Sequence, residues 1–291
     1  MATLKELNRR IGSVASTEKI TGAMKSISST KMHKAMRDLR RLQPFRQQIS
    51  SIFANILSSD AEFTSPLLEV REVKNCAVVV FGSDKGLCGA YNTNIIKALQ
   101  KIVDDLHSTY PGANVTVLTV GEKMLKAANK LRNTAVAPAE GVHPESGGDT
   151  VNTFSLSLQQ RFIDKEFDRV DLAYMSFKSI GRQRFATSEL LPVSVEALAA
   201  EASNSAKFRP YLFEPDPTSI FASALPMYLM SVMQDIFVEN KASEEAARVM
   251  AMQSANDNAK KLLEQLRLEY NKLRQQSITT ELLDILGGQV R

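Results

Sequence analysis

The segment FGSDKGLCGAYN (81–92) has the residue types and spacing that come nearest to a chemical motif. It follows the apolar run CAVVVF and precedes a helix-like stretch, and at such a junction α/β enzymes bind nucleotide phosphates through exposed backbone N–H groups and a helix dipole. A P-loop, however, needs a lysine and a hydroxyl directly after its last glycine, and a dinucleotide fingerprint needs GxGxxG. The segment has neither, so its glycines favour a tight strand-to-helix turn with Asn92 or Thr93 as the N-cap.

Histidines and cysteines add little further chemistry. The three histidines, His33, His107 and His143, are predicted to be solvated or packed, and no GxSxG, HExxH or paired CxxC motif occurs. Cys76 lies in the strand-like run and Cys88 in the glycine-rich turn, and this spacing suits neither a disulfide framework nor a metal site. We therefore expect two reduced, structural cysteines, no catalytic residue, no cofactor and no metal, which favours a structural or mechanical role.

Positive charge is concentrated at the amino-terminal end of the chain. Residues 1–46 contain eleven lysines and arginines against three acidic residues, whereas the remainder carries a net charge of about −4. Such a basic segment suits a solvated helix face, an acidic protein partner or a nucleic acid. Residues 1–44 contain no Phe, Tyr or Trp that would stack on single-stranded bases, which disfavours the nucleic acid.

Two segments have the pattern of very long helices. From Leu4 to about Ser58, and again from Pro226 to about Leu286, apolar residues recur at steps of three and four, with register shifts near Thr17 and Lys31. At 1.5 Å per residue these helices would be roughly 80 and 90 Å long, whereas a compact globule of this chain length is only about 50 Å across. Because each helix has one narrow apolar stripe, we predict that the two pair as an antiparallel coiled coil. The expected stripe members are Leu4, Leu7, Ile11, Val14, Ile20, Met24, Ile27, Ala35, Leu39, Leu42, Ile49 and Ile56, and Ala242, Ala246, Val249, Met252, Asn256, Ala259, Leu263, Leu266, Tyr270, Leu273 and Ser277.

The region between the helices alternates strand-like and helix-like runs. Strands are expected at 76–81, 114–120 and 168–179, an edge strand at 182–193, and helices between them. This order with short turns predicts a mostly parallel sheet covered by helices, and stretches rich in Pro, Gly, Ser and Asn predict loops. The loops are expected at 134–150 and 200–219. The expected fold class is therefore α/β, a long antiparallel coiled coil of the N- and C-terminal helices with an inserted Rossmann-like domain, divided into residues 1–58, 70–205 and 219–291.

Three blocks of sequence together resemble a known family. They are TLKELNRRIGSVASTEKITGAMKSISSTKM near the amino-terminal end, SDKGLCGAYN in the middle, and ENKASEEAARVMAMQSANDNAKKL followed by LEYNKLRQQSITTELLDILGG at the other end. All are similar to signature segments of the ATP synthase gamma subunit, and they occur in the same order. The resemblance implies a non-catalytic central-stalk rotor of an F-type proton-translocating ATP synthase, in which the beta subunits carry out catalysis.

The resemblance also implies partners and contact residues. The partners are the alpha and beta subunits of the catalytic head, the epsilon subunit and the c ring, with no nucleic acid and no direct membrane span. Basic side chains of the first helix would face an acidic loop on beta, and an apolar tail would sit in the upper bearing of the head. The implied head contacts are Arg9, Arg10, Met24, Lys25, Lys31, Arg274, Gln275 and Thr279; the bearing residues are Leu282, Leu283, Ile285 and Leu286; and Glu214 and Asp216 would approach the epsilon subunit and the c ring.

The chain also departs from the family pattern. Gly22 stands where many relatives have lysine, residues 26–30 are rich in hydroxyl groups, and the ending GGQVR lacks the usual small apolar residues. No transit peptide or chloroplast-type cysteine insertion is visible, so a bacterial subunit on the cytoplasmic face of the inner membrane is expected. Two other classes stay open: a small nucleotide-dependent enzyme with phosphate at the glycine-rich turn, and a coiled-coil scaffold or nucleic-acid arm with an α/β insert.

Overall fold

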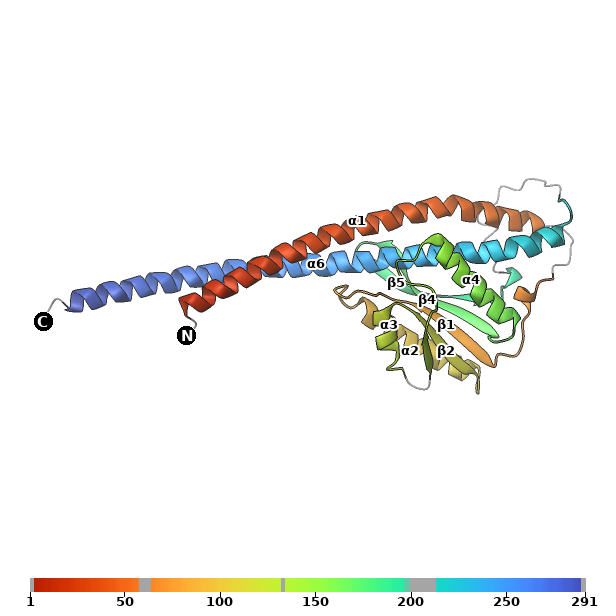
Figure 1. The fold of residues 1–291 in the computed structure, drawn as a ribbon, viewed down its shortest axis with the longest axis horizontal. Helices are drawn as coiled ribbons and strands as arrows, with labels where there is room; N and C mark the ends of the chain where they lie inside the picture. The colour runs from red at the N-terminus through yellow and green to blue at the C-terminus, as the bar shows by residue number, and fades with distance from the viewer. Residues whose placement is uncertain (1–2, 58–63, 132–133, 197, 199–212, 289–291) are drawn as a thin grey trace.

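Two very long helices and one compact α/β domain make up the protein (Figure 1). The computed structural model describes residues 3–57, 64–131, 134–196, 198 and 213–288. Helix α1 (Leu4–Leu57) and helix α6 (Pro217–Gly288) lie side by side, and the α/β domain packs beside one end of the pair. At the other end both helices project away from the domain, and α6 extends further than α1.

The two helices confirm the predicted long elements and correct one boundary. With 54 residues, α1 is about 81 Å long, and it continues through Pro44. With 72 residues, α6 is about 108 Å long and begins at Pro217, so Pro226 lies inside the helix and not in its first turn as predicted. Pro217 occupies the first-turn position that was predicted for Pro226. A proline is favoured there because its missing N–H removes no helical hydrogen bond.

Contacts along the pair show that it is antiparallel. Phe53, near the end of α1, packs against Phe221, near the start of α6, with ring centroids 5.4 Å apart. Near the other end of the pair, Asn256 of α6 donates a hydrogen bond to the backbone oxygen of Glu18 in α1 (2.6 Å). Residue numbers therefore rise along one helix as they fall along the other, which confirms the predicted orientation.

The α/β domain contains one five-stranded sheet in the order β3-β2-β1-β4-β5. The first four strands in this order are parallel, and β5 pairs antiparallel with β4 at one edge. Parallel neighbours need crossovers, and helices supply them here. The strands are β1 (Asn75–Phe81), β2 (Asn114–Val120), β3 (Ala135–Pro138), β4 (Arg169–Ser179) and β5 (Arg182–Leu191); the helices are α2 (Tyr91–Thr109), α3 (Glu122–Ala128) and α4 (Gly148–Ile163), and a short 3-10 helix, η1, spans Pro66–Leu68.

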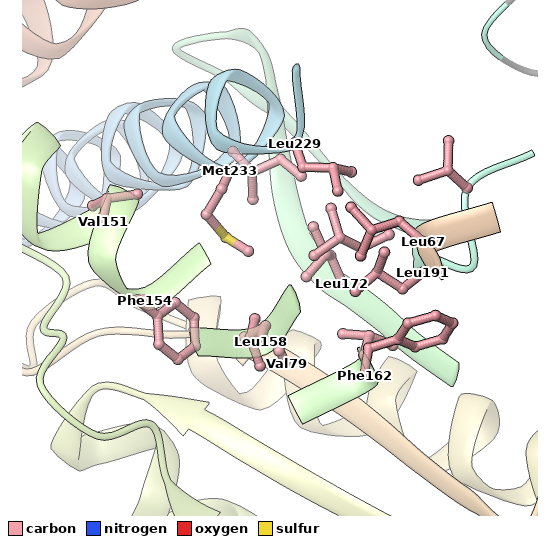
Figure 2. Packing of buried hydrophobic residues seen from close by; sticks show 14 of the residues in the cluster. Leu67, Val79, Val151, Phe154, Leu158, Phe162, Leu172, Leu191, Leu229 and Met233 are labelled. Carbon is pink, nitrogen blue, oxygen red and sulfur yellow. The ribbon is translucent and has the colours of Figure 1, made fainter. Parts of the chain in front are cut away.

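The sheet has a hydrophobic cluster on each face. Along β1, Val79 and Phe81 point to one face and Val78 and Val80 to the other, because successive side chains of a strand alternate. The second face is covered by α2 and α3. The first is covered by α4 and the amino-terminal part of α6, and Figure 2 shows residues of both helices meeting the sheet. The domain is thus built onto the long helix and has no separate core on that side.

Two predictions for the middle of the chain need correction or stay open. Strand β3 lies inside the stretch 134–150 that was predicted as a loop, since its four residues are too few to show an alternating pattern. Most of the other predicted loop, 200–219, lies outside the described residues. The division into three domains stays a prediction.

One stretch of α6 is long and apolar enough, by length and composition alone, to cross a membrane, whereas no direct membrane span was expected. This is weak evidence for a span, because core helices pass the same test, and 39% of the stretch is buried inside the protein. The amino-terminal part of α6 is apolar for a visible reason. Phe221, Leu225, Leu229 and Met233 pack into the first hydrophobic cluster.

Candidate functional site

The face of α1 that lies against α6 repeats every seven residues. We call this row the seam of α1; its members are buried or half-buried and are Leu7, Val14, Thr21, Ser28, Ala35, Leu42, Ile49 and Ile56. The predicted register shifts near Thr17 and Lys31 are therefore wrong. They were inferred from the positions of apolar residues, whereas the buried positions keep a constant spacing of seven residues. Ile20 and Ile27, two predicted stripe members, are 59% and 58% exposed, and Thr21 and Ser28 are buried in their place.

A hydrogen bond sets the register where the seam is polar. The Thr21 hydroxyl donates to the backbone oxygen of Thr17 (2.9 Å), which satisfies it inside the helix. The Asn256 side-chain amide of α6 donates to Glu18 O and lies 3.3 Å from Thr21 Oγ1. A buried polar residue in a coiled coil favours the one register in which its bonds form. The predicted seam members of α6 from Ala242 to Leu266 are buried, which confirms that part of the prediction, whereas Tyr270, Leu273 and Ser277 are only half-buried.

The predicted contact residues of α1 differ in their surroundings. Arg9 and Arg10 are exposed, and Met24 and Lys25 are half-buried beside the seam. Lys31 donates to Glu145 Oε1 (2.8 Å) in the loop before α4, so within the chain it joins the shaft to the α/β domain. Hydrogen bonding to Glu145 raises the pKa of Lys31, and the same bond lowers the pKa of Glu145.

Among the described residues, no helix lies beside the carboxyl-terminal part of α6. In the observed register the first residues of α1 lie near Tyr270, and α6 runs on alone beyond that level (Figure 1). Arg274, Gln275 and Thr279 are exposed there, and Thr279 Oγ1 donates to Gln275 O (2.9 Å). The apolar residues that follow are 55–64% exposed: Leu282, Leu283, Ile285 and Leu286. We call residues 274–286 the tip.

At the other end of α6, Asp216 caps the helix. Its carboxylate accepts hydrogen bonds from the backbone N–H of Ser219 (2.9 Å) and from the Ser219 hydroxyl (2.7 Å). These bonds lower the pKa of Asp216. The signal was present in the sequence as Asp-Pro-Thr-Ser, an N-cap residue followed by a first-turn proline. Glu214, the other predicted residue of this region, is exposed.

The glycine-rich segment forms the connection from β1 to α2, as predicted, and we call residues 82–90 the turn. Asn92 does not cap α2, because the N-cap position is Ala90 and no side chain caps the helix. Asn92 instead braces the turn: Nδ2 donates to Ser83 Oγ (2.7 Å), and Oδ1 accepts from the Ser83 N–H (3.3 Å). A Cβ on Gly82 would lie 2.5 Å from the Met124 side chain, so only glycine fits there.

The turn contacts α6 through its carbonyl oxygens. Arg248 of α6, whose side chain is only 6% exposed, donates from Nε to Gly86 O (3.3 Å) and from Nη2 to Lys85 O (3.4 Å). A phosphate cradle would need N–H groups directed at the ligand. In this turn an internal guanidinium binds two carbonyl groups, so the turn serves as an attachment to the shaft.

Polar side chains of α6 also fasten strand β4. Glu239 Oε1 accepts from the Ser176 hydroxyl (2.7 Å) and from the Phe177 N–H (3.0 Å). Further along, the Ser243 hydroxyl donates to Met175 O (2.8 Å). Asn240 Oδ1 accepts from the Met175 N–H (3.3 Å) and also from the hydroxyl of Tyr91 in α2 (2.8 Å). These residues were missed by the sequence analysis. Their only signal is a group of polar residues where an apolar helix face was expected.

Groups that carry chemistry are dispersed in the part of the chain that the structure describes. Cys76 and Cys88 are buried free thiols, as predicted, and burial raises the pKa of Cys76 to about 12. No group of three or more His, Cys, Asp or Glu side chains among the described residues is arranged to hold a metal ion. The features that distinguish the molecule are therefore surfaces: the paired helices, the turn and the tip.

The molecule is a two-helix shaft that projects from an α/β domain and ends in an exposed apolar tip. These features define its class as an elongated subunit of an assembly. The family model described as ATP synthase matches residues 3–290. The chain is 38% identical to the ATP synthase gamma chain of Phocaeicola vulgatus and 36% identical to that of Bacteroides fragilis, each over 290 residues and 100% of both chains. It is also 37% identical to the gamma chain of Chromobacterium violaceum, over 99% of both chains. The chain therefore belongs to the ATP synthase gamma chain family.

Solved structures of rotors share the fold. The rotor of the Euglena gracilis mitochondrial ATP synthase matches with a TM-score of 0.60 at 18% identity, over 94% of this chain and 98% of that chain. The central stalk and c-ring structure of the Tetrahymena thermophila enzyme matches with a TM-score of 0.54 at 21% identity, over 81% and 99%. At these identities the likeness concerns the fold alone, and it confirms the predicted fold class.

Proposed function

We propose that this chain is the non-catalytic rotor shaft of a bacterial F-type proton-translocating ATP synthase, bound peripherally at the cytoplasmic face of the inner membrane. Its partners are the alpha and beta subunits, the epsilon subunit and the c ring, and proton flow through the membrane sector turns it. Each shaft orientation favours a different conformation of the beta subunits through different contacts, which couples rotation to ATP synthesis or hydrolysis.

The exposed tip is the observation that carries this proposal. Near the end of α6, beyond the level where α1 lies beside it, four large apolar side chains are more than half exposed: Leu282, Leu283, Ile285 and Leu286. An exposed apolar patch of this kind marks a protein interface. The upper bearing of the alpha and beta head is the proposed cover, and Arg274, Gln275 and Thr279 are the proposed polar contacts just below it.

The basic side of the shaft supplies the second set of proposed contacts. Arg9 and Arg10 are exposed, and Met24 and Lys25 are half-buried, so all four side chains reach the surface of the paired helices. An acidic loop of beta complements this charge. Lys31 is proposed to act here as well, although it also binds Glu145 of the same chain.

The foot of the shaft is proposed to meet the epsilon subunit and the c ring near the start of α6. Glu214 is exposed and available for such a contact. Asp216 already accepts two hydrogen bonds as the helix cap, so its proposed contribution is to hold this end of α6 in place.

Reconstitution tests the proposal directly. The purified chain is mixed with alpha and beta subunits of the same organism, and the composition and ATP hydrolysis of the product are measured. We expect one copy of the chain with three of each partner, and no hydrolysis by the chain alone. Specific Mg²⁺-dependent nucleotide binding near Gly86 in the isolated chain would contradict the proposal and favour the enzyme alternative.

The proposed head contact is tested by replacing Arg274 and Gln275 together with alanine. We expect the isolated chain to fold normally, since both residues are exposed, and coupled ATP synthesis by the assembled complex to fall severalfold. The matched control replaces the Arg182-Gln183 pair of β5 with alanine, which leaves the tip unchanged. If coupled ATP synthesis were the same in the two variants, Arg274 and Gln275 would not be part of the proposed head contact.

A further inference from the structure

A buried charged cluster lies where α6 meets the turn. Arg248 donates from Nη2 to Glu244 Oε1 (2.5 Å), and its Nη1 lies 2.8 Å from Glu245 Oε1. The same guanidinium binds the carbonyl oxygens of Lys85 and Gly86 in the turn. The side chains of Arg248, Glu244 and Glu245 are only 6–9% exposed. One side chain therefore joins two carboxyl groups of the shaft to the backbone of the turn.

The cluster has one more acidic than basic group. Two carboxylates share a single guanidinium, and Glu245 Oε2 is buried with no hydrogen-bond partner among the described residues. A buried negative charge without compensation is unfavourable, and such a site relieves the cost by holding a proton. Arg248 keeps its own charge because both carboxyl groups stabilise it. The cost therefore falls on Glu244, because burial favours the protonated form of its carboxyl group.

The surroundings of Glu244 do not remove this imbalance. Lys31 of α1 interacts electrostatically with Glu245 and Arg248, but its side chain is half-exposed and already paired with Glu145. Lys85 of the turn also lies near Glu145, at 3.5 Å, with a side chain that is 68% exposed. The charged and titratable groups that face the cluster are Arg248 and Glu245 from α6, Asp84, Lys85 and Cys88 from the turn, Tyr91 from α2, Lys31 from α1, and Glu145 from the loop before α4.

We propose that Glu244, Glu245 and Arg248 form a proton-dependent latch between α6 and the turn. While Glu244 holds a proton, the cluster contains one fewer buried negative charge, and N–H groups of Arg248 bind Lys85 O and Gly86 O. When the proton passes to solvent, a second buried negative charge forms beside Glu245 Oε2. Water must then enter to solvate it, and the turn separates from α6. The latch is a property of this chain alone and does not depend on the proposed function.

The direction of the pH effect follows from the burial of Glu244. Burial raises the pKa of Glu244 to about 7, and the bond to Arg248 lowers it only in part. In the open latch, water surrounds the carboxyl group and its pKa returns to about 4.3, the ordinary value of glutamate. Between these two values the closed form holds a proton that the open form has lost. Opening therefore becomes about tenfold more favourable for each pH unit of increase between about pH 5 and 7, and the effect levels off above that range.

Hydrogen exchange of the full chain tests the latch. Protection of the backbone amides of residues 82–90 is measured by mass spectrometry between pH 5 and 8.5, with rates corrected for the intrinsic pH dependence. We expect protection in the wild type to fall about tenfold per pH unit up to about pH 7 and then to level off. The Glu244→Gln variant, which keeps the shape and removes the charge, should show constant protection, and so should Glu245→Gln if Glu244→Gln does not fold.

The matched control is Glu264→Gln, since Glu264 lies on the same helix and is exposed. It should behave as the wild type does. Infrared difference spectra supply a second readout, because a protonated carboxyl group that titrates near pH 7 should be present in the wild type and absent from Glu244→Gln or Glu245→Gln. Constant protection in the wild type, or a slope that persists in both glutamine variants, overturns the proposal.

Discussion

The two ends of the paired region of α1 and α6 are built from different residues. Near the α/β domain, Phe53 is fully buried and packs edge-on against Phe221 and Tyr228, with ring centroids 5.4 and 5.6 Å away. Farther along the shaft, the buried positions hold Thr21 and Asn256. A buried aromatic side chain contributes roughly 1.5–3 kcal/mol by burial alone, whereas a satisfied polar contact contributes about 1 kcal/mol.

The two ends of the paired region therefore have different roles: one mainly stabilises the pair, and the other mainly sets the alignment of α1 against α6. The aromatic end anchors the shaft to the domain, but the hydrophobic effect that stabilises it is non-directional. The polar end adds less energy, but its hydrogen bonds form in one alignment only. The tip is a third case, since its apolar residues are more than half exposed in the isolated chain. Substitutions at the three places should therefore have effects of very different size.

The largest effect is expected for Phe53→Ala. Removing a fully buried aromatic ring should lower the free energy of unfolding by about 3–5 kcal/mol, because the cavity cannot close between two helices that other contacts hold apart. Urea denaturation of the isolated chain measures it. Phe45→Ala is the matched control, since Phe45 lies on the same helix and is 47% exposed. Similar losses in both variants would show that the aromatic contact is not the anchor.

A smaller effect is expected for Asn256→Ala, at about 1 kcal/mol, because the bond to Glu18 O is lost and no buried donor is left behind. Asn258→Ala serves as the control, since Asn258 is exposed on the same helix. The same urea titrations measure both. If Asn256 also sets the register, its loss should change disulfide cross-linking between engineered cysteine pairs along the two helices. An unchanged pattern would limit Asn256 to a stabilising role.

The smallest effect on the isolated chain is expected for Leu283→Ser. Leu283 is 63% exposed, so the free energy of unfolding should change by no more than about 0.5 kcal/mol. Leu266→Ser provides the contrast, because Leu266 is 4% exposed and its loss should cost roughly 2–4 kcal/mol. Coupled ATP synthesis by the assembled complex should nevertheless fall in Leu283→Ser. A destabilised isolated chain would mean that the tip packs against the chain itself.

Much of the fold could be predicted because its signals are long. The two terminal helices run for 54 and 72 residues, so a repeated spacing stands out despite local exceptions. The same method failed in the middle of α1, where Ile20 and Ile27 were preferred over Thr21 and Ser28. Hydrophobicity predicts burial only on average, and a hydroxyl group that bonds to its own helix is buried at little cost.

The site was harder to predict than the fold. The exposed tip and the basic residues of α1 were identified through resemblance to a family, and their partner contacts stay predictions. Arg248 and Glu239 were missed, because nothing in their local spacing shows that they face a turn and a strand more than sixty residues away. Such contacts depend on how the domain lies against α6, which no local pattern records.

The sequence by itself determined the two long helices, their antiparallel pairing, the α/β insert and the family. These follow from periodicity and from blocks of residues that are each local in the chain. Only the tertiary structure decided which face of α1 is the seam and which residues fasten the domain to the shaft. It also decided that the glycine-rich turn binds an arginine of α6 through its carbonyl groups. The physical reason is that the burial and hydrogen bonding of a polar side chain depend on neighbours that are distant in sequence. A shift of a few ångströms in those neighbours decides whether the side chain stabilises or destabilises the fold.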